Sequence, residues 1–170
     1  QHHLNNGLYS KILKDFLKPR IVISKCIEFD TCRYNGQMIS SDFVEKLKSF
    51  LEFIPVCPEF EIGLGVPRDP IRVISLGGNL RLIQPKTEKD VTKDMVDFSN
   101  SFLDKLSDLD GFILKSKSPS CGIKDVKVHA GGGIPPKDPK GPGFFGKAVL
   151  EKYPNLAIED EGRLLNSRIK

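Results

Sequence analysis

The chain contains no long run of apolar residues, and this sets the first limit on its class. None of its apolar stretches approaches the roughly 18 residues that a membrane span requires. The N-terminus also shows no basic segment followed by an apolar stretch, which is the pattern of a secretory signal. We therefore expect no membrane partner and a cytoplasmic protein in a reducing compartment, where cysteines serve as ligands or catalysts more often than as disulfides.

Histidine and short cysteine spacings are also scarce. We interpret His2 and His3 as additions to the natural sequence, so His129 is the single internal histidine, and without supporting residues we expect it to be structural. No histidine lies near the cysteines, which disfavours a zinc hydrolase. Five residues separate Cys26 from Cys32, so the chain lacks the C-x2-C and C-x4-C knuckles of structural zinc sites and the cysteine runs of ferredoxins.

The length and charge of the chain are those of an ordinary globular protein. A chain of 170 residues, 39% hydrophobic and 28% charged, is long enough for one domain with a sizeable core. The net charge of +4 permits weak attraction to nucleic acid but does not demonstrate it. Two lysine pairs concentrate positive charge, and on charge alone a solvated loop face is the favoured interpretation for them: Lys115 with Lys117, and Lys124 with Lys127.

Hydrophobic spacing predicts an alternation of strands and helices. Residues 1–19 hold an expected N-terminal helix (8–17) and added residues, and residues 20–170 form the expected single domain. The predicted strands are 20–25, 53–56, 111–114 and 156–158, with a hairpin of 71–76 and 80–84 around Gly77-Gly78-Asn79. The predicted helices run from Ser41 or Asp42 to Leu51, from Thr87 or Lys89 to Leu106, from Phe144 to Tyr153, and from Glu161 onward.

This order of elements predicts an α/β fold, a Rossmann-like layered domain with a mainly parallel sheet. Residues 131–146 are too rich in glycine and proline for regular structure and suit either a lid over a site or a surface insertion.

Three of the four cysteines follow predicted strands. Cys26 and Cys57 come directly after their strands, and Cys121 follows strand 111–114 through a short loop. Because ligands bind outside the carboxyl ends of strands in open α/β sheets, we expect these thiols to share one site. A metal or an iron–sulfur cluster suits that donor set, and three thiolates would leave one iron of a four-iron cluster open.

Polar residues flank these thiols. Glu59, two residues beyond Cys57, could serve as a general base or a proton donor, although such a glutamate can also be a surface or helix-capping acid. Ser118-Pro119-Ser120 could cradle a polar substrate, although such motifs are usually simple turns. Arg33 could pair with a phosphate or a carboxylate, and Tyr34 could stack on a ring; the alternatives are a structural arginine and a core tyrosine.

In combination, these motifs resemble the thiouracil desulfidase family over residues 20–170. The matching segments are Ser24-Lys25-Cys26, Cys32-Arg33-Tyr34-Asn35-Gly36, Pro55-Val56-Cys57-Pro58-Glu59, Val66-Pro67-Arg68 and Ser118-Pro119-Ser120-Cys121-Gly122. The ending, residues 161–166, is similar to a junction after which some members carry a second domain, and those members are linked to 4-thiouridine in tRNA. The loop Ile27–Thr31 departs from the Leu-Leu-Gly form of small members, which bears on the substrate.

The resemblance implies a [4Fe-4S] cluster with one iron not bound by cysteine. Its ligands would be Cys26, Cys57 and Cys121. Glu59 would activate water and Ser118 would position or protonate the ring, while the role of Cys32 stays open. Arg33, Tyr34, Lys117 and Ser120 are the expected substrate-binding residues.

The implied reaction removes sulfur from a thiolated nucleobase, nucleoside or tRNA (2- or 4-thiouracil or 4-thiouridine) and gives uracil or uridine with hydrosulfide, without net redox change. Two other functions remain open on the sequence: a cluster-based sulfide carrier or donor, and a tRNA-binding module with a structural metal.

Overall fold

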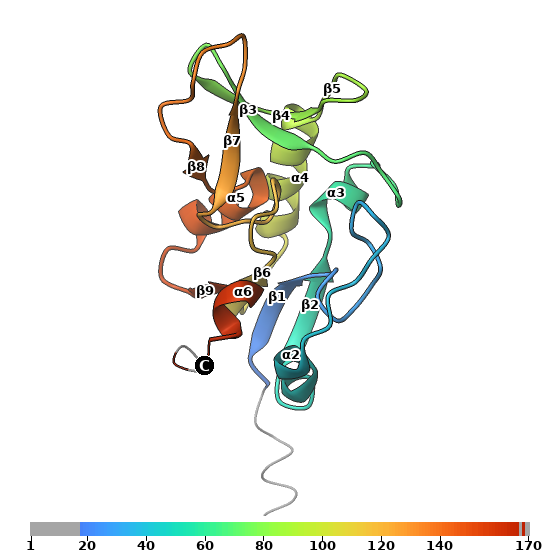
Figure 1. Ribbon diagram of the computed structural model, residues 1–170. Helices are drawn as coiled ribbons and strands as arrows, with labels where there is room; N and C mark the ends of the chain where they lie inside the picture. The colour runs from blue at the N-terminus through green and yellow to red at the C-terminus, as the bar shows by residue number, and fades with distance from the viewer. Residues whose placement is uncertain (1–17, 167, 169–170) are drawn as a thin grey trace, which may run out of the picture.

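A four-stranded, fully parallel sheet forms the lower half of the molecule in Figure 1, a computed structural model that describes residues 18–166 and 168. Its strand order is β2-β1-β6-β9. The strands are β1 (Arg20–Ser24), β2 (Glu52–Val56), β6 (Gly111–Leu114) and β9 (Ala157–Asp160). The central strands β1 and β6 are apolar runs covered on both faces, as parallel strands require. The strand β2 lies at the edge, where Pro55 costs little by lacking an N–H group. The predicted α/β class and parallel sheet are confirmed.

A second, five-stranded sheet lies above the first and was not predicted as a separate layer (Figure 1). Its order is β5-β4-β3-β7-β8, with β3 and β7 parallel and the other pairs antiparallel. Strands β3 (Arg72–Leu76) and β4 (Asn79–Gln84) form the predicted hairpin, and Gly77 and Gly78 both have positive φ, as a tight hairpin turn demands. The other strands are β5 (Lys89–Asp90), β7 (Val126–Ala130) and β8 (Lys140–Gly141).

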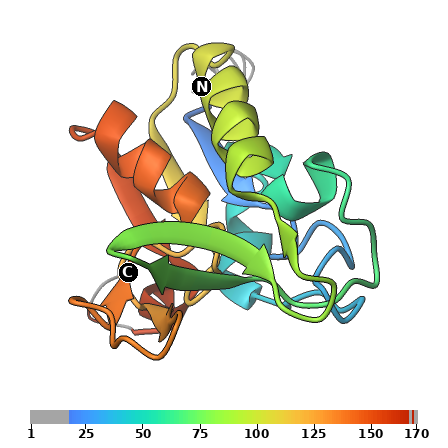
Figure 2. The ribbon, with the colours of Figure 1, turned by 90° about the horizontal axis from the view of Figure 1, so that it is seen from above.

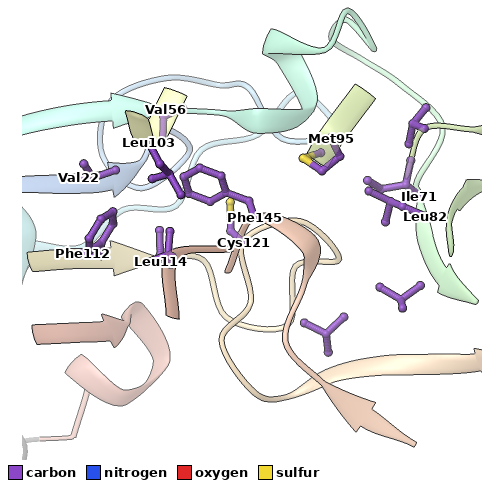
Figure 3. Packing of buried hydrophobic residues seen from close by; sticks show 14 of the residues in the cluster. Val22, Val56, Ile71, Leu82, Met95, Leu103, Phe112, Leu114, Cys121 and Phe145 are labelled. Carbon is purple, nitrogen blue, oxygen red and sulfur yellow. The ribbon is translucent and has the colours of Figure 1, made fainter. Parts of the chain in front are cut away.

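Two helices join the sheets through one hydrophobic core. Helices α4 (Thr92–Asp104) and α5 (Phe144–Lys152) lie on the same side of β3 and β4 in Figure 2. Phe145 of α5 belongs to one buried cluster with side chains from both sheets and from α4, and Figure 3 shows it close to Leu103 and Cys121. The cluster also contains Cys121, so the loop that carries this thiol is anchored in the core. The core therefore fixes the position of a predicted site residue.

Several predicted element boundaries are wrong. Helix α2 (Asp42–Leu47) begins at Asp42, one of the two predicted starts, and is capped by the Ser41 hydroxyl, but it ends before Phe50, which is largely exposed. Helix α4 begins at Thr92 and not at Thr87 or Lys89, because residues 89–90 pair with β4 instead. Two short helices complete the fold: α3 (Pro58–Glu61), which was not predicted, and α6 (Glu161–Leu164), which was.

The glycine- and proline-rich segment 131–146 is more ordered than expected. It contributes β8, which pairs with β7, and its last residues belong to α5. None of its residues lines the candidate pocket, so the described structure shows no lid over it, and the last residues, Phe145 and Gly146, are buried in the core instead. The predicted helix 8–17 lies outside the described residues. Among the described residues, no helix has both the length and the apolar character to cross a membrane.

Candidate functional site

Neighbouring parallel strands bring the predicted thiols to one pocket. Because β2, β1 and β6 are adjacent and run in the same direction, the loops after their carboxyl ends meet at one edge of the sheet. These loops enclose a pocket of about 320 Å³, lined by Cys26, Cys57, Cys121 and also Cys32. The expectation that strand-end thiols share one site is therefore met in the structure.

All four cysteines are free thiols and are buried. Within residues 18–166, no three histidine, cysteine, aspartate or glutamate side chains are arranged to hold a metal ion as they stand. A single zinc would need donors that each lie about 2.3 Å from it, hence close to one another. The four thiols do not meet this condition as they stand, although all four line the same cavity.

The thiols differ in how readily they lose a proton. A hydrogen bond with Cys32, a backbone N–H group of Phe60 and the Arg68 cation lower the pKa of Cys57 to about 7, against the effect of its burial. Burial and the neighbouring Cys57 raise the pKa of Cys26 to about 12. The hydrogen bond with Cys57 and burial raise the pKa of Cys32, and burial raises that of Cys121. Cys57 is therefore the thiol that most readily supplies a thiolate.

Glu59 enters the pocket from α3, which starts one residue after Cys57 because Pro58 suits the first helical position. Both carboxylate oxygens are held: the Ser120 hydroxyl donates to Oε1 at 2.8 Å, and Arg68 Nε donates to Oε2 at 2.8 Å. The Glu59 side chain is only 12% exposed. The alternative of a free surface glutamate is thus wrong.

The turn Ser118–Cys121 is held in place by its own hydrogen bonds and by α5. Ser118 Oγ accepts from the N–H groups of Ser120 and Cys121 and lies 3.0 Å from Ser120 Oγ. At the start of α5, the Gly146 N–H donates to the Ser120 carbonyl at 2.9 Å. A Cβ atom on Gly146 would lie 2.2 Å from the Gly122 carbonyl oxygen, so only glycine permits this approach. The turn is therefore rigidly placed against the core.

The expected substrate-binding residues also line the pocket: Arg33, Tyr34, Lys117 and Ser120. Tyr34 is 43% exposed, so the alternative of a core tyrosine is wrong. The Arg33 guanidinium lies 5.9 Å from the centre of the Tyr34 ring. The structure thus brings every residue predicted for the site into one pocket, while their roles remain predictions.

Sequence reasoning gave no role to two further pocket residues. Arg68 contacts Glu59, and Lys115, which also lines the pocket, pairs with Glu161 of α6. The Glu161 carboxylate also accepts from the Ser116 N–H at 2.6 Å, so Lys115 is not the solvated lysine that charge alone suggested. The motif Val66-Pro67-Arg68 was a signal for Arg68. Nothing in the sequence, however, shows that Arg68 contacts Glu59, which lies nine positions earlier. His129 lies on β7, away from the pocket, as expected for a structural residue.

The fold and the pocket together define an α/β protein that gathers thiols and a carboxylate at the carboxyl edge of a parallel sheet. The model of the 2-thiouracil desulfurase family matches residues 21–161, and the chain belongs to this family. This confirms the resemblance that the motifs indicated.

Two known proteins are similar to the chain. The uncharacterized protein YbbK of Bacillus subtilis (strain 168) is 32% identical over 111 residues, which cover 60% of this chain and 72% of YbbK. The solved structure of the [4Fe-4S]-dependent thiouracil desulfidase TudS matches with a TM-score of 0.64 at 24% identity, over 87% of this chain and 94% of that one. At this level of identity, the second likeness shows the fold.

Proposed function

We propose that the protein is a [4Fe-4S]-dependent desulfidase that replaces the sulfur of a thiolated uracil by oxygen. One observation carries the proposal: three buried thiols from three adjacent strand ends line the same pocket as a carboxylate held by two hydrogen bonds. Family membership supports the same activity. The name of the structurally similar TudS supports the cofactor.

The residues of the pocket fit a cluster. Iron–sulfur clusters are held by cysteine thiolates, and here four buried thiols line one pocket. Cys26, Cys57 and Cys121 would hold the cluster, with Cys57 binding first because its pKa is lowered to about 7. When bound, the cluster supplies a thiophilic, Lewis-acidic iron without a cysteine ligand, which polarises a carbon–sulfur bond.

Glu59 would take a proton from the attacking water in the proposed reaction. An ionised carboxylate has about four lone-pair sites. Ser120 and Arg68 occupy one on each oxygen, so sites remain for a water in the pocket. The reaction breaks the carbon–sulfur double bond, forms a carbon–oxygen double bond, and sends both protons of water to the leaving sulfur or to solvent, with no electron transferred.

Ser118 and Ser120 form a directed chain of hydrogen bonds that ends on Glu59. A carboxylate can only accept, so Ser120 uses its single hydroxyl hydrogen on Glu59 Oε1. Ser118, 3.0 Å away, must then donate to Ser120, and its own oxygen is occupied by two backbone N–H groups. In this arrangement Ser118 has neither a free hydrogen nor a free lone pair for a ring atom, so we propose that it acts by positioning Ser120 and, through it, Glu59; protonating the ring would require Ser118 to give up one of these bonds.

The charges around the pocket favour a substrate that carries phosphate. Five cations but only one acid line it: Lys25, Arg33, Arg68, Lys115, Lys117, and Glu59. Lys25, Arg68 and Lys115 are paired with carboxylates, whereas within the described chain Arg33 and Lys117 have no acidic partner. We therefore include in the proposed substrate class not only 2- and 4-thiouracil but also 4-thiouridine, as a nucleotide or in tRNA.

Anaerobic turnover tests the proposal. Protein reconstituted with iron and sulfide is expected to release sulfide from 4-thiouracil over many turnovers, while the thiouracil absorbance disappears. Glu59→Gln should keep its iron but lose about 10²- to 10⁴-fold in kcat, because it cannot accept the proton. Full turnover by this variant with its iron intact would show that Glu59 is not the base, and release of no more than one sulfide per protein would favour a sulfide carrier instead.

A further inference from the structure

Arg68 is a buried cation that joins three separate segments of the site. Its Nε donates to Glu59 Oε2 at 2.8 Å, and its Nη1 donates to the carbonyls of Cys32 at 2.9 Å and Gly65 at 2.8 Å. Its backbone N–H donates to the Tyr34 carbonyl at 2.9 Å. The side chain is only 4% exposed. A cation buried to this extent must be paired and hydrogen-bonded, and here it has both kinds of partner.

The Arg68 guanidinium is held in place by its hydrogen bonds as well as by its charge. Its planar fork uses Nε for the carboxylate and Nη1 for two carbonyls, while Nη2 lies 4.0 Å from the Cys57 sulfur. Ser120 holds the other oxygen of Glu59 from the opposite loop. A carboxylate gripped on both oxygens by groups from different segments cannot rotate freely. The direction of its remaining lone pairs is therefore set by Arg68 and Ser120 together.

We propose that Arg68 is a positioning residue that orients Glu59 for proton transfer, an inference that rests on the proposed function. Arg68 itself touches no reacting atom in this scheme. Its effect is geometric: a misplacement of about 1 Å in a reacting group can cost on the order of 10²-fold in rate. The planar guanidinium of Arg68 with its several donors, and not its positive charge alone, orients Glu59.

Substitution by lysine separates geometry from charge. Arg68→Lys keeps a cation beside Glu59 and Cys57, but one ammonium cannot reproduce a fork that bonds a carboxylate and two carbonyls at once. We expect this variant to keep its iron and nearly its KM while kcat falls by on the order of 10-fold or more. Arg68→Ala should lose more activity, and added methylguanidinium, but not methylammonium at equal ionic strength, should restore part of it.

A matched control comes from the second sheet. Arg81 also pairs with a carboxylate, that of Asp90, but this pair is exposed and lies outside the pocket. Arg81→Lys is expected to leave kcat and iron content unchanged. If Arg68→Lys likewise retained full kcat in an active, iron-loaded enzyme, the positioning role would be overturned while the proposed function stood.

A readout without the cluster keeps the inference testable on its own. In the ¹⁵N spectrum of cluster-free protein, the Arg68 Nε–H signal, assigned with Arg68→Lys, should be protected from exchange and should shift in Glu59→Gln. The same substitution should leave the Arg81 signal in place. An Arg68 signal that is unchanged in Glu59→Gln would overturn the inference even if both Arg68 variants failed to load iron. Absence of turnover by the wild type, with the shift present, would overturn the proposed function, and with it the proton-transfer role of Arg68, while leaving the Arg68–Glu59 contact established.

Discussion

At the scale of single residues, the four thiols of the pocket are not equivalent. Cys57 has the lowest pKa, and Cys32 shares a hydrogen bond with it. Cys26 and Cys121 are buried thiols on the neighbouring strand-end loops, and both interact electrostatically with Cys57. Cys32 lies in the loop that follows Cys26. Its position alone therefore does not decide whether Cys32 is a fourth ligand of the cluster or does not bind it.

Single substitutions are expected to separate these roles. Cys26→Ala, Cys57→Ala and Cys121→Ala should each lose most of the iron of anaerobically purified protein, because a cluster with two thiolate ligands is poorly held. Cys32→Ala should keep about four irons per chain and the visible absorbance of the cluster. Iron, sulfide and zinc analysis with a visible spectrum checks this. Loss of the cluster in Cys32→Ala would make Cys32 a ligand, and one zinc without colour in the wild type would remove the desulfidase mechanism.

At the scale of elements, the seat of α5 on the Ser118–Cys121 turn explains why this loop can hold a thiol in a fixed place. Gly146→Ala would put a methyl group 2.2 Å from the Gly122 carbonyl oxygen, so the helix or the turn must move. We expect a loss of about 1–3 kcal/mol in the free energy of unfolding, together with weaker iron binding.

Gly141→Ala provides the control for this substitution. Gly141 also belongs to a regular element, β8, but a Cβ there meets no atom within 4 Å, so the change should stay within about 0.5 kcal/mol. Urea unfolding of the two cluster-free variants measures the difference. Equal stability of the two would mean that α5 can shift without cost and that the turn is not held by this contact.

The elements also show how far the sequence could predict this fold. Strand β6 matches its predicted range, and β1 and β2 differ from theirs by one residue, because buried parallel strands are short apolar runs. The start of α4 was misplaced because the apolar spacing begins at Val91 and does not fix the start of the helix, whereas residues 89–90 pair with β4 across a turn. Strand β7 was missed because its alternation is short and its partners are distant in sequence. Pairings of this kind depend on tertiary contacts that no local pattern contains.

The site, like the fold, was predictable only in part. The thiols and Glu59 were predictable because each lies at or just after the end of a strand, where α/β sheets bind ligands. The residues that form hydrogen bonds in and around the site were not predictable. Glu161 reaches Ser116 from 45 positions further along the chain, and Arg68 reaches the Cys32 carbonyl across 36. Hydrogen bonds between residues this far apart in the chain produce no recognisable spacing pattern in the sequence.

At the scale of the whole molecule, we expect charge to influence which form of the proposed substrate is favoured. The chain carries a net charge of +4, and two cations at the pocket, Arg33 and Lys117, have no acidic partner within the described chain. Lys117 stands in a left-handed conformation, with φ of 58°, at the loop that leads to Ser118. A phosphate attached to the uracil nucleoside would supply the missing negative charge.

We therefore expect kcat/KM for 4-thiouridine monophosphate to exceed that for 4-thiouracil, and the advantage to shrink as salt is raised, because screening weakens attraction between exposed charges. Lys117→Gln should reduce kcat/KM for the nucleotide several-fold and leave that for the free base nearly unchanged. Lys93→Gln, which removes an exposed lysine of α4 paired with Asp97, serves as the control of equal net charge. Steady-state rates at low and high salt measure both effects. A Lys117→Gln variant that lost activity equally on base and nucleotide would show that Lys117 contacts the ring or shapes the loop, and the preference for phosphate would then have to come from Arg33 alone.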